Sequence, residues 1–216
     1  MGGGPVVTWP CATLQLLSIG GNVIYILQLA AILFGDGSAQ FKTELDLLIR
    51  HPKQYESSGY FKKYADFGYS LSPDEIKEYS RHQLMQMHFV EFATQKKLSL
   101  AVDWKGEASP HEVEDFLQTR LVALGRPKMD FSFVDTWEKT VNWKSLESGD
   151  FILKKFVVIG SELSKDGLIL ANLQDGSDTY QIFLLTKEQF DATQHLRGED
   201  RFFRIENVGK ALESTH

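Results

Sequence analysis

The chain has 216 residues, of which 43% are hydrophobic, and a formal net charge of −6 at pH 7. This length fits one domain with enough apolar side chains for a core. The acidic balance argues against a nucleic-acid binder, because phosphate contacts need a basic face, and it fits a cytoplasmic protein or one that meets a basic partner. The single Cys11 excludes an intramolecular disulfide and a cysteine-built zinc site.

The N-terminal part of the chain is uncharged and apolar. Residues 1–35 carry no charged side chain, and the run Val6–Phe34 is long enough to cross a membrane, since roughly 20 apolar residues suffice. Gly20-Gly21 interrupts this run and no Lys or Arg precedes it, which argues against a signal peptide or a membrane anchor. We therefore expect Val23–Phe34 to be a buried helix and Met1–Gly21 to be an apolar extension, with membrane association as the alternative.

Helical spacing and capping motifs place the next helices. Phe41, Leu45 and Leu48 recur at the helical spacing and predict a helix that ends before Pro52. Two Ser-Pro-x-Glu motifs then predict helix starts, because Ser caps the first amides, Pro suits the first helical position and Glu reaches back from the third. They are Ser72-Pro73-Asp74-Glu75, opening a helix over Asp74–Lys97, and Ser109-Pro110-His111-Glu112, opening a helix over His111–Leu124.

Between and after these helices the pattern changes. Leu98–Trp104 alternates apolar and polar residues and predicts a strand. Asp130–Phe133 is short and apolar, and we expect it to be extended. The motif Asp135-Thr136-Trp137-Glu138 then predicts a capping box that opens a helix ending near Leu146.

The stretch Gly149–Leu163 fits two local structures. Its β-branched residues are typical of strands, whereas its apolar residues, among them Ile152 and Phe156, recur at the helical period. We favour a helix, with Lys154 and Lys155 on the side opposite these apolar residues.

The strongest local signal is a β-hairpin around Asp175-Gly176-Ser177-Asp178. Two apolar runs, Leu168–Leu173 and Tyr180–Leu185, flank this turn, and Asp-Gly favours a hairpin because Gly accepts a positive φ. Both faces of the second run are mostly apolar, which predicts strands covered at least in part on both sides. After the hairpin, Thr186-Lys187-Glu188-Gln189 predicts a capped helix, and Arg201–Ile205 predicts a last short strand.

Together these elements predict an α+β fold. The hairpin requires an antiparallel pairing, and helices and strands do not alternate strictly. We expect a small antiparallel or mixed sheet centred on the hairpin, with several helices packed mainly on one face. The expected organisation is an extension over residues 1–21, a single domain over residues 22–208 and a polar tail over residues 209–216.

The segment Asp103-Trp104-Lys105 is the first candidate binding segment. It ends the predicted strand, and ligand sites in α/β sheets gather at the ends of strands. Asp103 would act as a base or accept a ligand hydrogen bond, and Trp104 would form a flat apolar wall. The structural alternative is that Trp104 covers the core, while Asp103 pairs with Lys105 or caps a loop.

The hairpin turn supplies the second candidate cluster, made of Asp175, Ser177, Asp178 and Tyr180. Carboxylates with a hydroxyl suit a hard cation, but no Glu follows at the offset that an EF-hand requires. Asp and Ser are also the residues that satisfy the backbone groups of a turn. We expect neither a metal ion nor a cofactor. If both clusters lie at the same edge of the sheet, a shared site or a partner surface becomes the favoured interpretation.

Residues of both clusters resemble those of a known family. Leu100-Ala101-Val102-Asp103-Trp104-Lys105 and the run from Asp166 to Tyr180 are similar to an uncharacterised family of bacterial proteins, whose members share a strand ending in Asp-Trp-Lys and a Gly-x-Asp-x-Tyr hairpin. The resemblance covers roughly Val23–Leu196, implies a helix over Gly149–Leu163 and brings no known activity. The hairpin and the acidic charge also resemble, more loosely, the immunity proteins that neutralise bacterial toxins, which are small soluble α+β modules without catalytic residues.

From these observations we expect a soluble, non-catalytic protein-binding module of immunity or regulatory type. Asp103, Asp175 and Asp178 would present negative charge to a basic protein, and Trp104 and Tyr180 would supply rigid contact area. The alternative is a hydrolase-like or metal-dependent enzyme that uses Asp103 and Asp178 as an acid–base or metal pair. A cavity that buries both carboxylates would favour the enzyme, whereas two exposed turns would favour the binding module.

Overall fold

The computed structural model describes residues 21–51, 54–55, 80–142, 145–147, 149–196 and 203–208. The elements in chain order are α1 (Gly21–Phe34), the short 3-10 helix η2 (Gly35–Gly37), α2 (Ser38–Arg50), α6 (Arg81–Gln95), β1 (Ser99–Asp103), α7 (Glu112–Ala123), α8 (Ser132–Glu138), α9 (Asp150–Ser164), β2 (Leu168–Gln174), β3 (Thr179–Thr186), α10 (Lys187–Gln194) and β4 (Arg204–Asn207). The polar tail and, apart from Gly21, the proposed extension lie outside the described residues, so the domain limits stay a prediction.

The strands form one four-stranded sheet in the order β1-β3-β2-β4, with antiparallel pairing between neighbours. Its centre is the predicted hairpin, in which β2 and β3 pair along their length, with Leu170 opposite Leu184. Gly176 in the turn has φ +82°, the left-handed conformation for which an Asp-Gly turn needs glycine. The α+β class and the hairpin are therefore confirmed.

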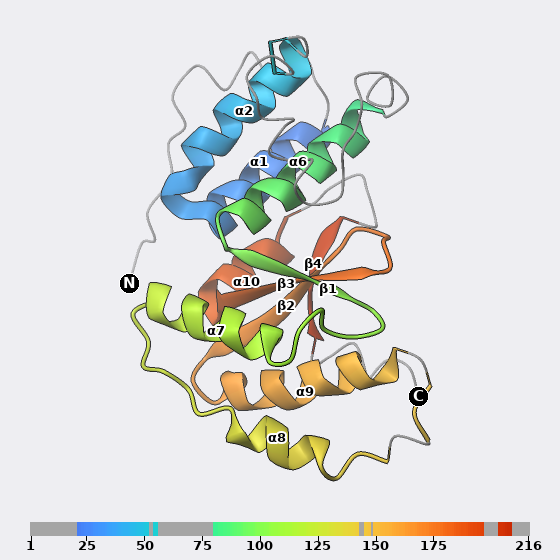
Figure 1. The fold of residues 1–216 in the computed structure, drawn as a ribbon. Coiled ribbons are helices and arrows are strands. Elements are labelled where there is room, and N and C mark those ends of the chain that lie inside the picture. Colours follow the sequence, from blue (N-terminus) through green and yellow to red (C-terminus); the bar gives the residue numbers. More distant parts are fainter. Residues whose placement is uncertain are drawn as a thin grey trace.

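Helices cover both faces of this sheet (Figure 1). Phe183 and Leu185 of β3 belong to the core under α1, α2, α6 and α10, which we call the upper layer. Ile182 and Leu184 belong to the core with α7, α8 and α9, which we call the lower layer. Because β3 carries large apolar side chains on both faces, each face needs a cover. The expectation that both faces of the hairpin are covered is thus met, and the helices are shared between the faces rather than packed mainly on one.

The two cores differ in composition. In the upper core the ring centroid of Phe34 lies 4.7 Å from that of Phe89 and 5.0 Å from that of Phe92, and Phe41 meets both of these rings edge-on. The lower core is mainly aliphatic and unites α7 and α9 through Val113, Leu117, Leu121, Ile152, Phe156, Ile159 and Leu163. Helices α1, α2 and α9 were each expected at these positions, and their helical spacing reflects these buried faces.

The start of α7 differs from the prediction. The helix begins at Glu112, and the residue before it, His111, adopts a left-handed conformation with φ +63° and makes no side-chain cap. Glu112 N donates to the carbonyl oxygen of Ser109 rather than to its side chain, and Val113 N donates to Glu107 Oε1, outside the expected motif, at 2.9 Å. The Ser-Pro-x-Glu box at Ser109 was therefore wrong as the cap of this helix.

Helix α6 begins with a capping box that sequence reasoning missed. Ser80 precedes the helix, its Oγ accepts a hydrogen bond from Gln83 N, and Ser80 N donates to Gln83 Oε1. The predicted box at Ser72–Glu75 lies outside the described residues. Helix α10, by contrast, begins as expected, with the box formed by Thr186 and Gln189.

Helix α8 replaces two expected elements. The stretch Asp130–Phe133, predicted as extended, instead leads into a helix that starts at Ser132 and ends at Glu138, well before Leu146. Asp130 Oδ1 accepts a hydrogen bond from Ser132 N at 2.9 Å, so the stabilising carboxylate lies before the predicted box rather than at Asp135. At the other end of the chain, β4 overlaps the predicted last strand at Arg204 and Ile205.

One helical run in the described part of the chain, Val23–Arg50, is long and apolar enough to span a membrane by length and composition. About 39% of its most apolar window is buried in the fold. Buried core helices and signal sequences have the same properties, so this run is weak evidence for a membrane protein. In the structure Ile26, Leu29 and Leu33 of α1 belong to the upper core.

Candidate functional site

The pairing of β1 with β3 brings the two predicted clusters to one end of the sheet. Asp103 lies opposite Thr179, which directly follows the hairpin turn. The loop after β1 and the β2–β3 turn therefore lie side by side (Figure 1). We call this region the acidic end, and it consists of Asp103, Trp104, Lys105, Asp175, Ser177 and Asp178.

The backbone of the first loop is fixed by the side chain of Asp103. Its Oδ1 accepts a hydrogen bond from Lys105 N at 2.8 Å, and its carbonyl oxygen accepts one from Gly106 N at 3.0 Å. The Trp104 ring packs on the start of α9, where a Cβ added to Gly149 would lie 2.7 Å from Trp104 Cε3. Lys105 Nζ lies 5.4 Å from the centroid of the same ring. Trp104 is thus held between a helix start and a cation, with part of its surface exposed.

The hairpin turn closes through its own polar side chains. Asp175 Oδ1 accepts a hydrogen bond from Ser177 N at 2.9 Å, and Ser177 Oγ accepts one from Thr179 N at 3.3 Å. Asp178 is exposed. Tyr180 does not join the acidic end, because its ring packs edge-on against Phe156 in the lower core, with centroids 5.5 Å apart. Partial burial there raises the pKa of the Tyr180 hydroxyl.

The acidic end presents carboxylates to solvent. Asp103 and Asp178 are both exposed, and Asp103 and Asp175 are held by backbone amides. A desolvated member is what would favour acid–base catalysis by a carboxylate pair. Exposed carboxylates on a fixed backbone are better suited to contact a cationic surface.

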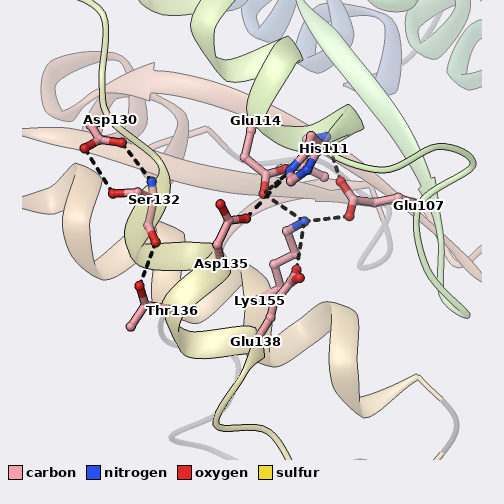
Figure 2. Close-up of polar contacts among 10 residues, drawn as sticks. Glu107, His111, Glu114, Asp130, Ser132, Asp135, Thr136, Glu138 and Lys155 are labelled. Atoms are coloured by element: carbon pink, nitrogen blue, oxygen red, sulfur yellow. Dashed lines mark hydrogen bonds and ion pairs between the residues drawn. The ribbon is translucent and has the colours of Figure 1, made fainter.

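A second polar cluster lies in the lower layer and was not predicted. Lys155 of α9 is 1% exposed, and its Nζ lies 2.6 Å from Glu107 Oε2, 2.9 Å from Glu114 Oε1 and 3.5 Å from Glu138 Oε1 (Figure 2). Burial by itself lowers the pKa of this ammonium, but the hydrogen bonds and charges of Glu107 and Glu114 outweigh it, and the pKa is raised. Glu107 also caps α7, so the cluster ties the loop that follows the acidic end to two helices.

The expectation that Lys154 and Lys155 share one polar side was wrong. Lys154 is exposed and pairs with Asp150 at 3.6 Å, whereas Lys155 points under α7 and α8. Consecutive helical residues are roughly 100° apart, so the second lysine reaches a side of α9 that other helices cover. A lysine within the apolar run Phe151–Ile159 is the only local sign of this burial.

The upper layer contains a buried histidine. Tyr55 Oη lies within hydrogen-bond distance of His88 Nδ1, at 2.9 Å, and the imidazole stacks on Phe41 with centroids 5.1 Å apart. Glu44 Oε2 lies 3.7 Å from His88 Nε2 and would favour an imidazolium. Burial is the stronger effect and lowers the pKa of His88 to about 3, so the imidazole is neutral at pH 7.

Within the described ranges, no group of three or more His, Cys, Asp and Glu side chains is arranged to hold a metal ion. A family model described as Domain of unknown function (DUF6630) matches residues 26–206. A search of curated proteins and a search of solved structures found no match. The family match covers most of the sheet, both helical layers and the acidic end. It confirms the expected resemblance to an uncharacterised domain family. Two expectations stay predictions: that the two motifs are features of this family, and that the chain resembles immunity proteins.

Proposed function

The chain belongs to the DUF6630 family, and from this premise we propose that it is a non-catalytic protein-binding module whose acidic end contacts a basic partner protein. The family match brings no activity, so the proposal depends on the site itself. Its finer form is a soluble protein of the bacterial cytoplasm with an immunity-type or regulatory role. The participation of α1 in the upper core supports the soluble form.

One observation carries this proposal: the β1–β3 register places the loop of Asp103 beside the turn of Asp175 and Asp178. Two segments far apart in the sequence thus present carboxylates at one end of a rigid sheet. Backbone hydrogen bonds fix Asp103 and Asp175, so less conformational freedom is lost on binding. Trp104 adds a held aromatic surface of the kind that dominates binding interfaces.

The alternative enzyme would use Asp103 and Asp178 as an acid–base or metal pair. Such a role calls for a shared cavity in which at least one carboxylate is desolvated. Both side chains are exposed, which favours the binding module. The net charge of −6 also favours association with a basic protein, because long-range attraction raises the rate of encounter.

The test is affinity capture from a lysate of the source organism with the wild type and the triple variant Asp103→Asn, Asp175→Asn, Asp178→Asn. Asparagine keeps the side-chain oxygen that accepts the amides of Lys105 and Ser177, so the variant loses charge while the turns persist. We expect the wild type to retain a basic protein in a salt-sensitive manner and the variant to bind it at least about tenfold more weakly.

A matched control removes three exposed carboxylates elsewhere, through Asp36→Asn, Asp166→Asn and Asp191→Asn. Asp166 and Asp191 adjoin the opposite end of the hairpin, and Asp36 lies between α1 and α2. This variant has the same net charge as the acidic-end variant and should capture the partner as the wild type does. Equal capture by all three proteins, or no basic protein at any salt concentration, would refute the proposal.

A further inference from the structure

A buried carboxylate in the lower layer has an oxygen without a donor. The Glu114 side chain on α7 is 7% exposed, and its Oε1 lies 2.9 Å from Lys155 Nζ. Its Oε2 accepts no hydrogen bond from any residue that the structure describes. A buried carboxylate oxygen without a hydrogen bond lowers the stability of the fold, so this atom is an acceptor for a further N–H group.

The surroundings of Glu114 are also short of positive charge. Glu107, Glu114 and Glu138 share the single ammonium of Lys155, and Asp135 lies beside them on α8 (Figure 2). Among the described residues, three carboxylates thus share one ammonium, and a fourth, that of Asp135, lies 4.0 Å from His111 Nδ1. Such a surplus of negative charge attracts a further cation.

His111 lies beside Glu114 and Asp135 and is largely exposed. Its Nδ1 is 3.8 Å from Glu114 Oε1 and 4.0 Å from Asp135 Oδ1, and its side chain is 58% exposed. Because more than half of the imidazole is exposed, other rotamers of His111 are open to it. The side chains of Asp135 and Glu138, which are 50% and 32% exposed, line the approach from solvent.

We propose that Glu114, Asp135 and Glu138 form a binding site for the guanidinium group of an arginine in the partner protein, with His111 as its movable cover. The site adjoins the loop that follows the acidic end, because Glu107, four residues after Asp103, shares Lys155 with Glu114. The identity of the ligand as part of a basic protein rests on the proposed function. The chemistry of the site rests on these three carboxylates and can be tested without that partner.

A peptide-borne arginine fits better than other cations. A guanidinium is planar and donates in parallel to two carboxylate oxygens, whereas an ammonium acts as a point charge. Free arginine would bring its own carboxylate into a region that already holds surplus negative charge. We therefore expect N-acetylarginine amide to bind more tightly than free arginine or N-acetyllysine amide.

The experiment is a titration of the isotope-labelled full chain with N-acetylarginine amide, followed by NMR of side-chain carboxyl and imidazole signals. We expect saturable shifts at Glu114, Asp135 and His111. Glu114→Gln should weaken binding at least about tenfold, since hydrogen bonds to charged groups are the strong ones. Asp135→Asn, at a half-exposed position, should weaken it in the same direction, and Glu162→Gln at the far end of α9 should leave it unchanged.

His111→Gly gives a second, opposite readout. Glycine suits the left-handed backbone at this position, and it removes the cover, so this variant should bind the amide more tightly than the wild type. Absence of saturable shifts in both the wild type and this variant would overturn the site, as would equal or tighter binding of the lysine amide. Failure of partner capture by the acidic end would refute the proposed function and leave this result standing.

Discussion

In the upper layer the buried His88 and Gln181 contact hydroxyl groups, whereas in the lower layer the buried Lys155 is held by carboxylates. His88 lies against the Tyr55 hydroxyl and stays neutral, and Gln181 Nε2 donates to Ser99 Oγ at 2.5 Å. In the lower layer, Lys155 remains an ammonium among carboxylates. One sheet can thus support two kinds of interior. In one, the buried His88 is neutral; in the other, the stability of the buried ammonium depends on its carboxylate partners.

The helix starts differ in the same direction. Helices α6 and α10 of the upper layer begin with complete capping boxes, at Ser80 and Thr186. Helices α7 and α9 of the lower layer begin after left-handed residues, His111 and Gly149, without side-chain caps of their own. The starts of α7 and α9 therefore rely on contacts from residues outside the helix start, Glu107 and Trp104, whereas the starts of α6 and α10 rely on their own capping boxes.

Removing the buried ammonium should have the largest effect. Lys155→Met leaves three carboxylates without their common cation, and we expect a loss of about 3–5 kcal/mol in the free energy of unfolding, measured with urea. The control is Lys154→Met, which breaks only an exposed pair with Asp150 and should cost less than about 1 kcal/mol. Similar values for the two variants would mean that the lower layer does not depend on its charges.

The next effect tests the start of α9. Gly149 has φ +92°, and an added Cβ would meet Trp104 Cε3 at 2.7 Å, so Gly149→Ala should cost roughly 3 kcal/mol through backbone strain and overpacking together. Gly125 also has a positive φ, of +67°, but open space around it, so Gly125→Ala should cost roughly 1 kcal/mol. Urea unfolding of both variants measures the difference. Equal losses in unfolding free energy would show that the Trp104 ring shifts to make room for the added Cβ at little cost.

The neutral histidine predicts a pH dependence of the upper layer. The unfolded chain takes up a proton at His88 below its ordinary pKa of 6.5, whereas the folded chain resists protonation down to about pH 3. Stability must therefore fall as the pH falls through this window, by roughly 2–3 kcal/mol between pH 6.5 and about pH 4.5.

The variant His88→Gln isolates this contribution. Glutamine does not titrate, so the difference in unfolding free energy between wild type and variant should shrink as the pH is lowered. Urea unfolding at the two pH values gives that difference directly. A constant difference across the window would contradict the neutral, desolvated state of His88.

The smallest effect compares a real cap with an expected one. Ser80→Ala removes the oxygen that accepts Gln83 N and should destabilise the protein by about 1 kcal/mol. Ser109 lies in the motif that was predicted to cap α7 but does not cap it. Ser109→Ala should therefore change stability by less than about 0.5 kcal/mol. Thermal or urea unfolding distinguishes them, and a larger loss for Ser109→Ala would reverse the assignment of caps.

Local signals in the sequence predicted the elements whose determinants are local. The Asp-Gly turn predicted the hairpin, the Thr186–Gln189 box predicted α10, and the helical period predicted α9. The predicted capping box at Ser109 was wrong, because the carboxylate of Glu107, outside the tetrapeptide, accepts a hydrogen bond from the Val113 amide of α7. A pattern of four residues does not include an acceptor such as Glu107, which lies outside those four.

The candidate site was predictable only in part for a similar reason. Each acidic segment was identified from its own residues, but their union depends on β1 pairing with β3 rather than with β2. Tyr180 is a predicted member of the site because of its neighbours in sequence, and strand alternation places its ring against Phe156 of the lower core. The burial of Lys155 depends on the carboxylates of three other segments, and the sequence around Lys155 does not predict which residues these are.

The most direct test of the acidic end as a binding surface is zero-length cross-linking of carboxylates to lysines of the captured partner, with peptide mapping by mass spectrometry. The account predicts cross-links at Asp103, Asp175 and Asp178 and none above background at Asp36, Asp166 and Asp191. Cross-links that concentrate at the latter three residues, or that spread evenly over all six, would contradict it.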